Sequence, residues 1–507
     1  MELVRADSML RKACEMMEGR TAKGEPVEQN LPLAERLLNE LLDNNIGNLT
    51  VLYTLASLHL SKGHAGLAIQ ILSFVVQRDK NFGEAWNNLG LAYKEINQWE
   101  KAAKCAIEAA KLVPHPDIPT NVAACHLNRG MPDIALQWAD KALALDPNHS
   151  KAKWHKAMAL LELSRWEEAW DWHESRLEGG GNYNIAPRNY HADSKWREDK
   201  QTPYWDGKAV LGDYDTRPAR IVIHGEQGMG DEIMFASCIP DVLEKGVQVI
   251  FEPSPRLEGL FKRSFPAVHR VHGTDETNGK GWIAELGEPD YMCALGSLPK
   301  FYRRSTEAFP GTPYLVPDPK RKALCQARLW ALGQKPKVGI AWQGGVHSTR
   351  QDIRSFHPRL YEQLYRHDVD FISLQYDQTA RANVEDVQRE FGVDIHHWPE
   401  WVESVGPEGN PSDMDDLAAL ISCLDLVITV PQTCYHVAGG LGIPCWVLTQ
   451  SEPDWRLGIT DDTVPWYNSV SLIRQPKGTR DWMHVIRTAD ARLEEFLIQN
   501  GNSKKAV

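Results

Sequence analysis

The residues best suited to chemistry lie in a glycine-rich stretch that ends in a carboxylate. Residues 224–231 read H-G-E-Q-G-M-G-D, and the β-branched run Ile221–Ile223 precedes them. A buried strand, a glycine loop and a helix N-terminus in this order bring a ligand close to bare backbone and direct amide N–H groups at an anion. The spacing of Gly225, Gly228 and Gly230 is G-x-x-G-x-G, not the dinucleotide fingerprint. The loop therefore does not indicate a nicotinamide cofactor.

The carboxylate that closes this loop, Asp231, has two interpretations. It can cap the following helix by accepting hydrogen bonds from first-turn amides. It can also serve as a general base, held beyond the carboxyl end of the strand, that takes a proton from a substrate hydroxyl. We interpret the nearby Glu226 as a loop-capping group and not as a second catalytic acid.

Two later apolar strands also end in small or polar residues. The first, V-G-I-A-W-Q-G-G at residues 338–345, is followed by Thr349 and Arg354. The second, L-V-I-T-V-P-Q-T-C-Y-H at residues 426–436, places Gln432 and Thr433 where a helix N-terminus would point at a diphosphate. Three such loops in one chain favour a site for a ligand that carries phosphate.

Composition excludes several classes of protein. A net charge of −12 gives no general attraction to nucleic acid or to acidic membranes. Nine cysteines without a C-x-x-C pair indicate reduced thiols, and the charged N-terminus lacks the apolar core of a signal peptide. Because no apolar stretch is long enough to span a bilayer, we expect a cytoplasmic protein without a membrane span. His396 and His397 lack further ligands at metal spacing, so we expect no metal.

The elements ahead of these loops are helical and repeat. Small residues recur 34, 33 and 34 residues apart, and each is followed twelve residues later by alanine; they are Ala56, Gly90, Ala123 and Ala157. Residues 86–93 read W-x-x-L-G-x-x-Y, which resembles the tetratricopeptide repeat. Small residues are needed where the two helices of a unit cross closely. We expect an N-terminal segment at 1–30 and a tetratricopeptide solenoid at 31–177. The solenoid either binds peptides, or only braces the remainder or mediates self-association.

The remaining chain alternates short apolar runs with helical stretches, the pattern of a doubly wound α/β fold. After a linker at 178–218, whose aromatic residues predict that it packs against something, we expect two Rossmann-like halves at 219–318 and 319–507. Strands are predicted at 247–252, 282–286, 291–294, 338–342, 371–375, 426–430 and 445–448. Helices are predicted at 256–264, 320–332, 357–367, 384–391, 414–423, 436–441 and 482–499.

The three loops together resemble those of a known group of enzymes. G-E-Q-G-M-G-D, W-x-G-G…R-S and Q-T-x-x-H-x-A-G-x-L-G-x-P-x-W look like bacterial proteins that join tetratricopeptide repeats to a glycosyltransferase. The catalytic part is similar to the ADP-heptose:lipopolysaccharide heptosyltransferases of glycosyltransferase family 9, and the overall design is similar to protein O-linked N-acetylglucosamine transferases. The resemblance implies a GT-B fold, a nucleotide-diphosphate sugar as donor, a C-terminal half that holds it, and neither metal nor cofactor.

The resemblance also assigns roles to individual residues. The family's G-D pair falls on Gly230 and Asp231, with the aspartate as base. Its D-T-x-x-x-H phosphate loop falls on residues 431–436, where Pro431 replaces the aspartate and Gln432 takes the threonine position. The residues expected to bind the donor are Gly228, Gly230, Trp342, Gly344, Gly345, Arg354, Gln375, Gln432, Thr433 and His436. Three of these have other interpretations: Trp342 as core, Arg354 as a solvated surface residue, and His436 as a helix residue packed on the sheet.

The function predicted in this way is a metal-independent glycosyl transfer to a hydroxyl of a protein or glycan, with the repeats recruiting the acceptor or a partner. Asp231 would take the proton of the hydroxyl, while Arg354 and backbone amides stabilise the departing diphosphate. Two alternatives remain open. The chain can be a scaffold with an inactive transferase domain, which Pro431 favours. It can also be an enzyme that modifies the nucleotide sugar itself, such as an epimerase.

Overall fold

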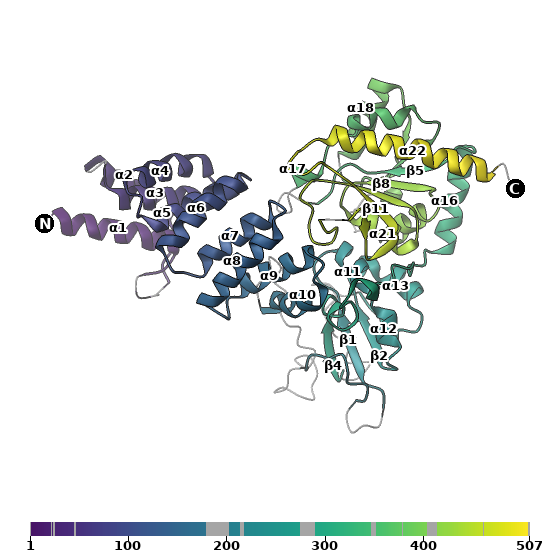
Figure 1. Cartoon of the computed structure of the whole chain (residues 1–507), viewed down its shortest axis with the longest axis horizontal. Coiled ribbons are helices and arrows are strands. Elements are labelled where there is room, and N and C mark those ends of the chain that lie inside the picture. The colour runs from purple at the N-terminus through teal and green to yellow at the C-terminus, as the bar shows by residue number, and fades with distance from the viewer. Residues whose placement is uncertain are drawn as a thin grey trace. The chain divides into compact units, whose positions relative to one another are not determined.

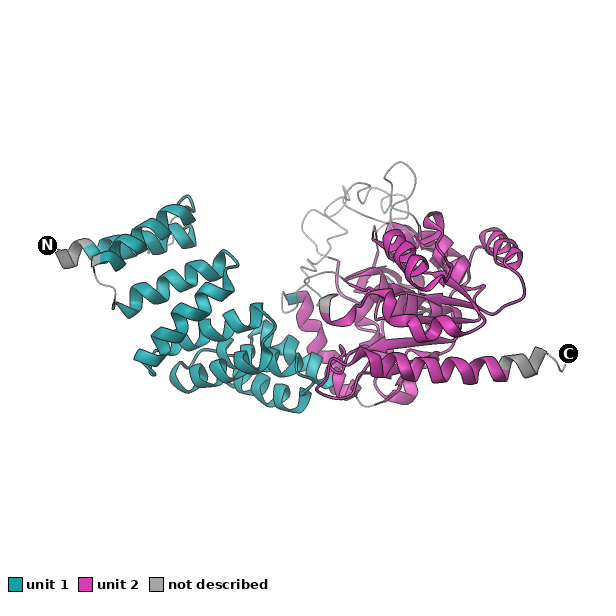
Figure 2. Ribbon diagram, turned by 90° about the horizontal axis from the view of Figure 1, so that it is seen from above, with its two compact units in different colours: residues 1–160, 178–181 teal, residues 161–177, 182–507 magenta. Residues whose placement is uncertain are grey.

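The computed structural model describes residues 2–21, 23, 26–44, 47–178, 202–212, 217–273, 289–345, 351–377, 379–402, 413–459 and 461–504. The chain divides into two compact units, drawn in different colours in Figure 2. The first comprises residues 1–160 and 178–181, and the second comprises residues 161–177 and 182–507. Each unit is described separately below.

The first unit is built from helices that pack one on the next along the chain (Figure 1). They are α1 (Glu2–Glu18), α2 (Leu31–Asn44), α3 (Leu49–Ser61), α4 (Ala65–Arg78), α5 (Gly83–Glu95), α6 (Trp99–Leu112), α7 (Asp117–Leu127), α8 (Pro132–Leu145) and α9 (Ser150–Glu162). The small residues that defined the period are buried where helices cross: Ala56, Ala68, Ala102 and Ala123 have no exposed surface. A Cβ on Gly90 would lie 3.2 Å from the Ala102 carbonyl oxygen. The helical repeat solenoid predicted from the sequence is confirmed.

Helix α1 departs from the prediction that residues 1–30 precede the ordered repeats. Its Ala13 is buried in one cluster with Ala34 and Leu38 of α2. The segment lacks the repeat's small residues, so the period alone did not include it.

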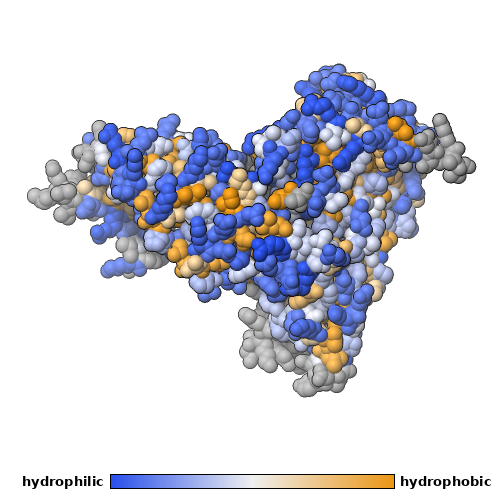
Figure 3. Space-filling model, viewed as in Figure 1, coloured by the Kyte–Doolittle hydropathy of each residue, from blue (hydrophilic) through white to orange (hydrophobic). Residues whose placement is uncertain are grey.

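Apolar side chains that remain exposed on the repeats include Leu67 and Phe74 of α4 and Leu145 of α8. Figure 3 shows hydrophobic residues interspersed with a mainly hydrophilic surface.

The second unit contains two separate sheets. The smaller is parallel, with the order β3-β2-β1-β4, and its strands are β1 (Arg220–His224), β2 (Gln248–Glu252), β3 (Arg270–Val271) and β4 (Tyr291–Ala294). Ile223 of the central β1 pairs with Phe251 on one side and Cys293 on the other, and all three are buried. The helices α11 (Met229–Ala236), α12 (Ile239–Leu243) and α13 (Glu258–Ser264) follow β1 and β2. The strand predicted at 282–286 lies outside the described residues.

The larger sheet is mixed and has the order β10-β11-β9-β8-β5-β6-β7. Its strands are β5 (Lys337–Ile340), β6 (Asp370–Ser373), β7 (Ile395–His396), β8 (Leu426–Thr429), β9 (Cys445–Thr449), β10 (Thr463–Val464) and β11 (Tyr467–Arg474). Only β10 and β11 pair antiparallel among them. The accompanying longer helices are α16 (Pro319–Ala331), α18 (Ala380–Phe391), α20 (Asp415–Ile421), α21 (Thr433–Leu441) and α22 (Trp482–Lys504). The C-terminal region is therefore α/β, as predicted.

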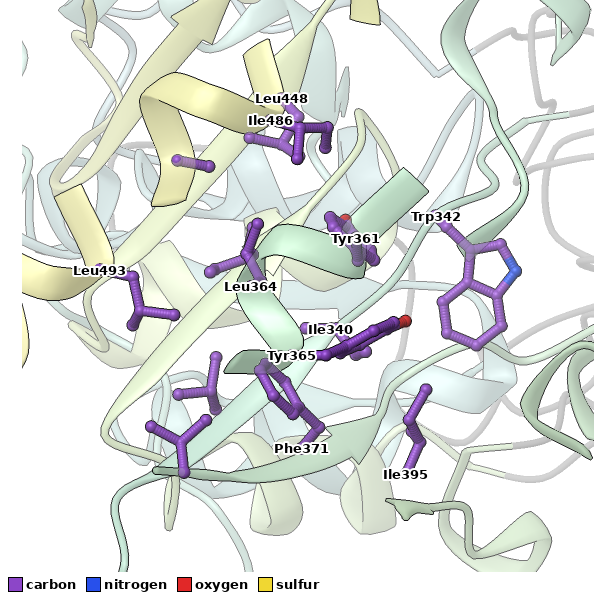
Figure 4. Close-up of a cluster of buried hydrophobic side chains, with 14 of the residues drawn as sticks. Ile340, Trp342, Tyr361, Leu364, Tyr365, Phe371, Ile395, Leu448, Ile486 and Leu493 are labelled. Carbon is purple, nitrogen blue, oxygen red and sulfur yellow. The ribbon is translucent and has the colours of Figure 1, made fainter. Parts of the chain in front are cut away.

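One predicted helix of this region has a different form. The segment expected to be α-helical at 357–367 is a 3-10 helix, η7 (Pro358–Arg366). Tyr361, Leu364 and Tyr365 from η7 are buried in the core cluster drawn in Figure 4. A 3-10 helix brings residues three apart onto one face, which suits the pair of apolar residues at 361 and 364.

The boundary predicted at residue 177 also differs in the structure. Helix α10 (Trp166–His173) and the 3-10 helix η1 (Glu174–Glu178) follow the repeat period, yet residues 161–177 cluster with the α/β unit. Trp170 is fully buried, and its indole N–H donates a hydrogen bond of 2.7 Å to the carbonyl oxygen of Arg303. The Trp166 indole N–H donates to the Thr306 hydroxyl at 3.1 Å. These two tryptophans bind α10 to the second unit.

Much of the predicted linker, including Tyr183, Tyr190 and Trp196, lies outside the described residues. Trp205 is described and is 3% exposed. Its backbone N–H donates to the carbonyl oxygen of Met292 in β4, and its ring contacts the ring of Phe301. Around Trp205 the segment therefore packs on the smaller sheet.

Candidate functional site

The glycine loop lies at the carboxyl end of β1 and leads into α11. Gly228 is the N-cap of this helix and Asp231 is its third residue. The Asp231 Oδ2 accepts the backbone N–H of Gly228 at 3.3 Å. Gln227 adopts a left-handed conformation with φ of 61°, which is uncommon for a residue with a side chain. Asp231 thus caps the helix from its third position, as in a capping box, and not as the N-cap residue that bonds first-turn amides, and its second carboxylate oxygen is left for another partner.

That partner is Arg456, which the sequence did not indicate. The Arg456 Nε donates to Asp231 Oδ1 at 2.6 Å, and Nη2 lies 2.5 Å from the same oxygen. Nη2 also donates to Gln227 Oε1 at 3.2 Å, so one guanidinium binds two residues of the glycine loop. Burial raises the pKa of Asp231 above its usual 3.8, and the charge of Arg456 offsets only part of this rise. Asp231 is therefore more basic than an ordinary aspartate.

The turn that carries Arg456 is fixed by aromatic packing. The guanidinium carbon lies 4.8 Å from the ring centre of Trp455. Trp455 is 4% exposed and contacts the rings of Trp170 and Phe235. Asp454 Oδ1 accepts the backbone N–H of Arg456 at 2.9 Å. Asp454 and Trp455, the two residues before Arg456, are thus held in place, while the guanidinium of Arg456 extends to the glycine loop of the smaller sheet.

Glu226 fixes the start of the same loop. Its carboxylate accepts two hydrogen bonds from Arg176, at 2.7 and 2.8 Å, and one from the backbone N–H of Gly296 at 2.7 Å. Burial alone would raise the pKa of Glu226, but the Arg176 guanidinium outweighs burial and holds the pKa below its usual 4.5. The two buried charges neutralise each other and share hydrogen bonds, which agrees with a loop-fixing role for Glu226.

The loop after β5 is held from two sides. Gln375 Oε1 accepts the backbone N–H groups of Trp342 and Gln343, both at 3.1 Å, and its amide N–H donates to the Gln343 carbonyl oxygen. The Gln375 side chain is therefore engaged in shaping this loop. Trp342 has no exposed surface and belongs to the core cluster (Figure 4), which supports its interpretation as core.

The same loop makes close contact with the loop after β8. A Cβ on Gly344 would lie 2.4 Å from the Pro431 carbonyl oxygen and 3.1 Å from the Gln432 Cβ. Gly344 must therefore lack a side chain so that the two loops can meet. Its backbone N–H donates to the Ser355 hydroxyl at 3.1 Å, and Gly345 is left-handed with φ of 77°.

The N-terminus of α21 carries a buried side-chain oxygen that has no hydrogen-bond partner within the described part of the chain. Gln432 is the N-cap and is 7% exposed. Its amide N–H donates to the Thr429 hydroxyl at 3.1 Å, but its Oε1 has no hydrogen-bond partner among the described residues. Leaving a buried acceptor unpaired is unfavourable by about 1–3 kcal/mol, so this oxygen is suited to receive a hydrogen bond from a ligand. Thr433 follows as the first residue of α21.

His436, one turn further along α21, joins this loop to the glycine loop. A Cβ on Gly230 would lie 2.9 Å from His436 Cδ2, so the ring rests on the glycine backbone. His436 Nδ1 forms a hydrogen bond of 3.0 Å with the Tyr467 hydroxyl. Burial, assisted by the charge of Arg456, holds the pKa of His436 well below 6.5, so the ring is neutral at pH 7. Both interpretations of His436 remain, because it is packed in the core and also borders Gly230, the residue before Asp231.

The structure thus brings together Gly230, Asp231, His436 and Arg456, while Gly344 meets Gln432 alongside. Arg354 lies at the end of α17 (Gln351–Arg354) and is half-buried. Its charge acts on Tyr435 together with those of Arg456 and Asp231, although burial is the main cause of the raised pKa of Tyr435. Asp454 acts on Tyr435 as well, so the charges of two arginines and two carboxylates act on the N-terminal turn of α21.

Within the described ranges, no cluster of three or more His, Cys, Asp or Glu side chains could hold a metal ion. Over those same ranges, every helix is too short or too polar to cross a bilayer.

Comparison with known proteins gives a relative for most of the chain and others for about a fifth of it. No protein-family model matches the chain. It is 31% identical over 423 residues to Protein FlbA of Caulobacter vibrioides, an alignment that covers 80% of this chain and 66% of that protein. The chain thus spans just under two thirds of the length of this relative. It is also 31% identical over 107 residues to Tetratricopeptide repeat protein 7A of Homo sapiens, covering 21% of this chain and 12% of that protein.

Among solved structures, the chain resembles proteins with tetratricopeptide repeats over about a third of its length. The crystal structure of MamA aligns at 22% identity with a TM-score of 0.28, covering 29% of this chain and 87% of that one. TTC0263, described as a tetratricopeptide-repeat protein of Thermus thermophilus, aligns at 20% identity with a TM-score of 0.28, covering 34% and 90%.

Proposed function

We propose that the second unit is a metal-independent glycosyltransferase of the GT-B type. It would move a sugar from a nucleotide-diphosphate sugar to a hydroxyl of a protein or glycan. The observation that carries the proposal is the juxtaposition of Asp231, on the glycine loop of one sheet, with the N-terminal turn of α21 from the other sheet. A base and a phosphate site on opposite sides of one reaction centre are what such a transfer requires.

The diphosphate would bind at the N-terminus of α21, where backbone N–H groups and the helix dipole favour an anion. Gln432 Oε1 is a buried acceptor at this point and suits a hydroxyl or N–H of the donor. Pro431 supplies no side-chain contact, so the phosphates would rely on main-chain amides and on nearby arginines. Arg354 and Arg456 supply the positive charge that stabilises the leaving diphosphate.

In the transfer itself, the acceptor hydroxyl attacks the anomeric carbon of the sugar. Asp231 takes the proton of that hydroxyl, and its raised pKa increases its strength as a base. The bond between the anomeric carbon and the phosphate oxygen breaks through an oxocarbenium-like state, as in glycoside hydrolysis. The diphosphate leaves with the bonding electrons.

The repeats would recruit the acceptor or a partner protein. Exposed apolar side chains such as Leu67, Phe74 and Leu145 offer contacts on this unit. A second candidate function is a scaffold with an inactive transferase domain. It is favoured by the loss of the acidic residue at Pro431 and by the occupation of the Asp231 carboxylate by Arg456.

The two functions are separated by one series of measurements on the full chain. A thermal-shift screen with ADP-, UDP-, GDP- and dTDP-sugars should show stabilisation by one nucleotide class. Release of the free nucleoside diphosphate from that donor should then be detectable, and Asp231→Asn should abolish release while donor binding is retained. Binding without any turnover would support the scaffold, and the absence of binding by all four classes would contradict the glycosyltransferase.

A further inference from the structure

The guanidinium of Arg456 occupies the carboxylate that the proposed function uses as its base. Nε and Nη2 both bind Asp231 Oδ1, and the Gly228 N–H binds Oδ2. Since each carboxylate oxygen has two lone pairs, Oδ1 is fully engaged and Oδ2 is partly engaged. The Asp231 side chain is only 12% exposed. A hydroxyl could not deliver its proton to Oδ1 while Arg456 remains there.

The position of Arg456 gives it a second destination. The guanidinium binds Asp231, whose neighbour Gly230 lies against His436 in the first turn of α21, so it lies near the proposed diphosphate site. Arginine presents a planar fork of donors that matches phosphate oxygens as well as it matches a carboxylate. A diphosphate also carries more negative charge than Asp231. Its arrival would therefore compete for the same guanidinium.

We propose that Arg456 masks Asp231 until the donor is bound. The diphosphate draws the guanidinium away from the carboxylate, which frees Asp231 to accept the acceptor's proton. The same movement places a cation on the phosphate oxygen that becomes the leaving group. This inference rests on the proposed function and adds an obligatory order to it, in which the donor binds before the acceptor can react. Without donor, water or an acceptor would find Oδ1 of Asp231 occupied by Arg456 and Oδ2 bound by the Gly228 N–H.

The turn around Arg456 fits such a movement of the side chain alone. Trp455 is buried between Trp170 and Phe235, and the backbone N–H of Arg456 is held by Asp454. The guanidinium lies over the Trp455 ring, a surface along which a planar cation keeps its stacking interaction while its edge changes partners. No backbone rearrangement is required.

Masking has a thermodynamic signature that a structural ion pair lacks. If Asp231 and the diphosphate compete for Arg456, the apparent donor affinity of the native chain is reduced by the fraction of molecules that are masked. Removing the negative charge of Asp231 should therefore tighten binding of a nucleoside diphosphate. The gain should disappear when Arg456 is removed as well.

The test uses calorimetric titration of the full chain with ADP, UDP, GDP and dTDP, followed by a double-mutant cycle on the nucleotide that binds. We expect Asp231→Asn to tighten binding by about tenfold, which corresponds to a pair masked in about nine molecules of ten. Arg456→Gln should weaken it by about tenfold or more, as expected for charge-assisted hydrogen bonds. Asp231→Asn combined with Arg456→Gln should bind no better than Arg456→Gln alone.

Controls keep the outcomes distinct. Arg359→Gln removes an exposed arginine of the same unit, which pairs with Glu390, and should leave affinity unchanged. Arg456→Lys is the substitute if Arg456→Gln folds poorly. It retains the positive charge, so it should bind the nucleotide more weakly than the native chain but more tightly than Arg456→Gln. Unchanged or weaker nucleotide binding by a folded Asp231→Asn variant would overturn the masking proposal while leaving the transferase intact. Failure of all four nucleotides to bind would overturn both.

Discussion

Arg176 and Glu226 form a two-pronged ion pair whose side chains are 0% and 1% exposed. Arg176 lies in η1, directly after α10, and Glu226 lies in the glycine loop 50 residues further along the chain. Arg176 also donates to Glu174 and Ser297. The segment that follows the repeats is thus bound to the loop that positions Asp231.

Removing one member of this pair should destabilise the second unit. Arg176→Gln leaves the Glu226 carboxylate buried without its counter-ion, and such losses are unfavourable by about 3–5 kcal/mol. Chemical denaturation should show this change in the transition of the α/β unit and not in that of the repeats. Arg165→Gln is the matched control, because Arg165 pairs with Glu168 on the surface at 45% and 54% exposure. Arg165→Gln should lower the free energy of unfolding by less than about 1 kcal/mol. An equal loss in both variants would contradict a stabilising role for the buried pair.

The boundary between the units can be tested by truncation. Ser164 lies in the turn between α9 and α10. Residues 1–164 should give a cooperative helical melt, since stacked repeats carry their own core. Residues 165–507 should also fold, whereas residues 178–507 should melt at a lower temperature because they lack Trp166, Trp170 and Arg176. Equal melting temperatures for residues 165–507 and residues 178–507 would show that α10 is not part of the α/β unit.

Asp231→Asn should separate the two roles of this residue. Asparagine still accepts the Gly228 N–H as a helix cap, so the melting temperature should change little. It cannot take a proton, and a positioned general base contributes on the order of 10²–10⁴-fold. Turnover should therefore fall by about that factor. Near-normal turnover with a reduced melting temperature would assign the residue to capping alone.

The pH dependence of turnover should carry the same signature. A base must be deprotonated to act, so kcat/KM should rise with pH through a midpoint above 3.8, because burial raises the pKa of Asp231. The free energy of unfolding should change with pH in the opposite direction. A carboxyl whose pKa is raised on folding stabilises the protein below pH 3.8, and this contribution is lost as pH rises through the folded pKa. Rate profiles and melting curves over pH 3–8 for the native chain and Asp231→Asn would test both. An Asp231→Asn variant with the same acidic limb would contradict this assignment.

Gly344→Ala should weaken nucleotide binding by separating two loops. The added methyl group would meet the Pro431 carbonyl oxygen at 2.4 Å, so the loops after β5 and β8 must move apart. Calorimetry should show a loss of affinity, with the repeats unaffected. Gly66→Ala is the control, since a Cβ there meets nothing within 4 Å, and an alanine inside α4 should stabilise that helix by up to about 1 kcal/mol. Unchanged affinity in a folded Gly344→Ala variant would remove this loop from the donor site.

Local sequence predicted the elements whose signal lies within a short window. The repeats followed from alanines that recur with one period, and strands β1, β2, β4, β5, β6, β8 and β9 followed from apolar runs such as 221–223 and 426–430. Helix α1 and the strands β3, β7, β10 and β11 were not predicted, and the helix predicted at 357–367 is the 3-10 helix η7. Helix α1 lacks the small residues of the repeat, and η7 differs from an α-helix only in the pairing of its backbone.

The site was predictable where a glycine marked it and not where a distant cation completed it. Gly230, Asp231, Gln432 and His436 belong to strand-to-helix motifs with recognisable spacing, at or near the start of α11 and α21. Arg456 forms its ion pair with a residue 225 positions away and lies in no such motif. Its neighbour Trp455 was one of eighteen tryptophans without a distinguishing signal. Contacts of this kind arise from how the two sheets meet, which no single stretch of sequence contains.

The assignment of α10 to the second unit has a consequence for how such chains can diverge. The residues that hold α10 and η1 in the α/β unit all lie after residue 164; they are Trp166, Trp170 and Arg176. Insertion or deletion of a whole 34-residue period before that point would leave those contacts unaltered. The length of the repeat array is therefore free to drift among descendants, or to be redesigned, by duplication and loss of complete units. A gene that gained or lost one repeat would change the surface that the repeats present while keeping the contacts of α10 and η1 with the glycine loop and its neighbours.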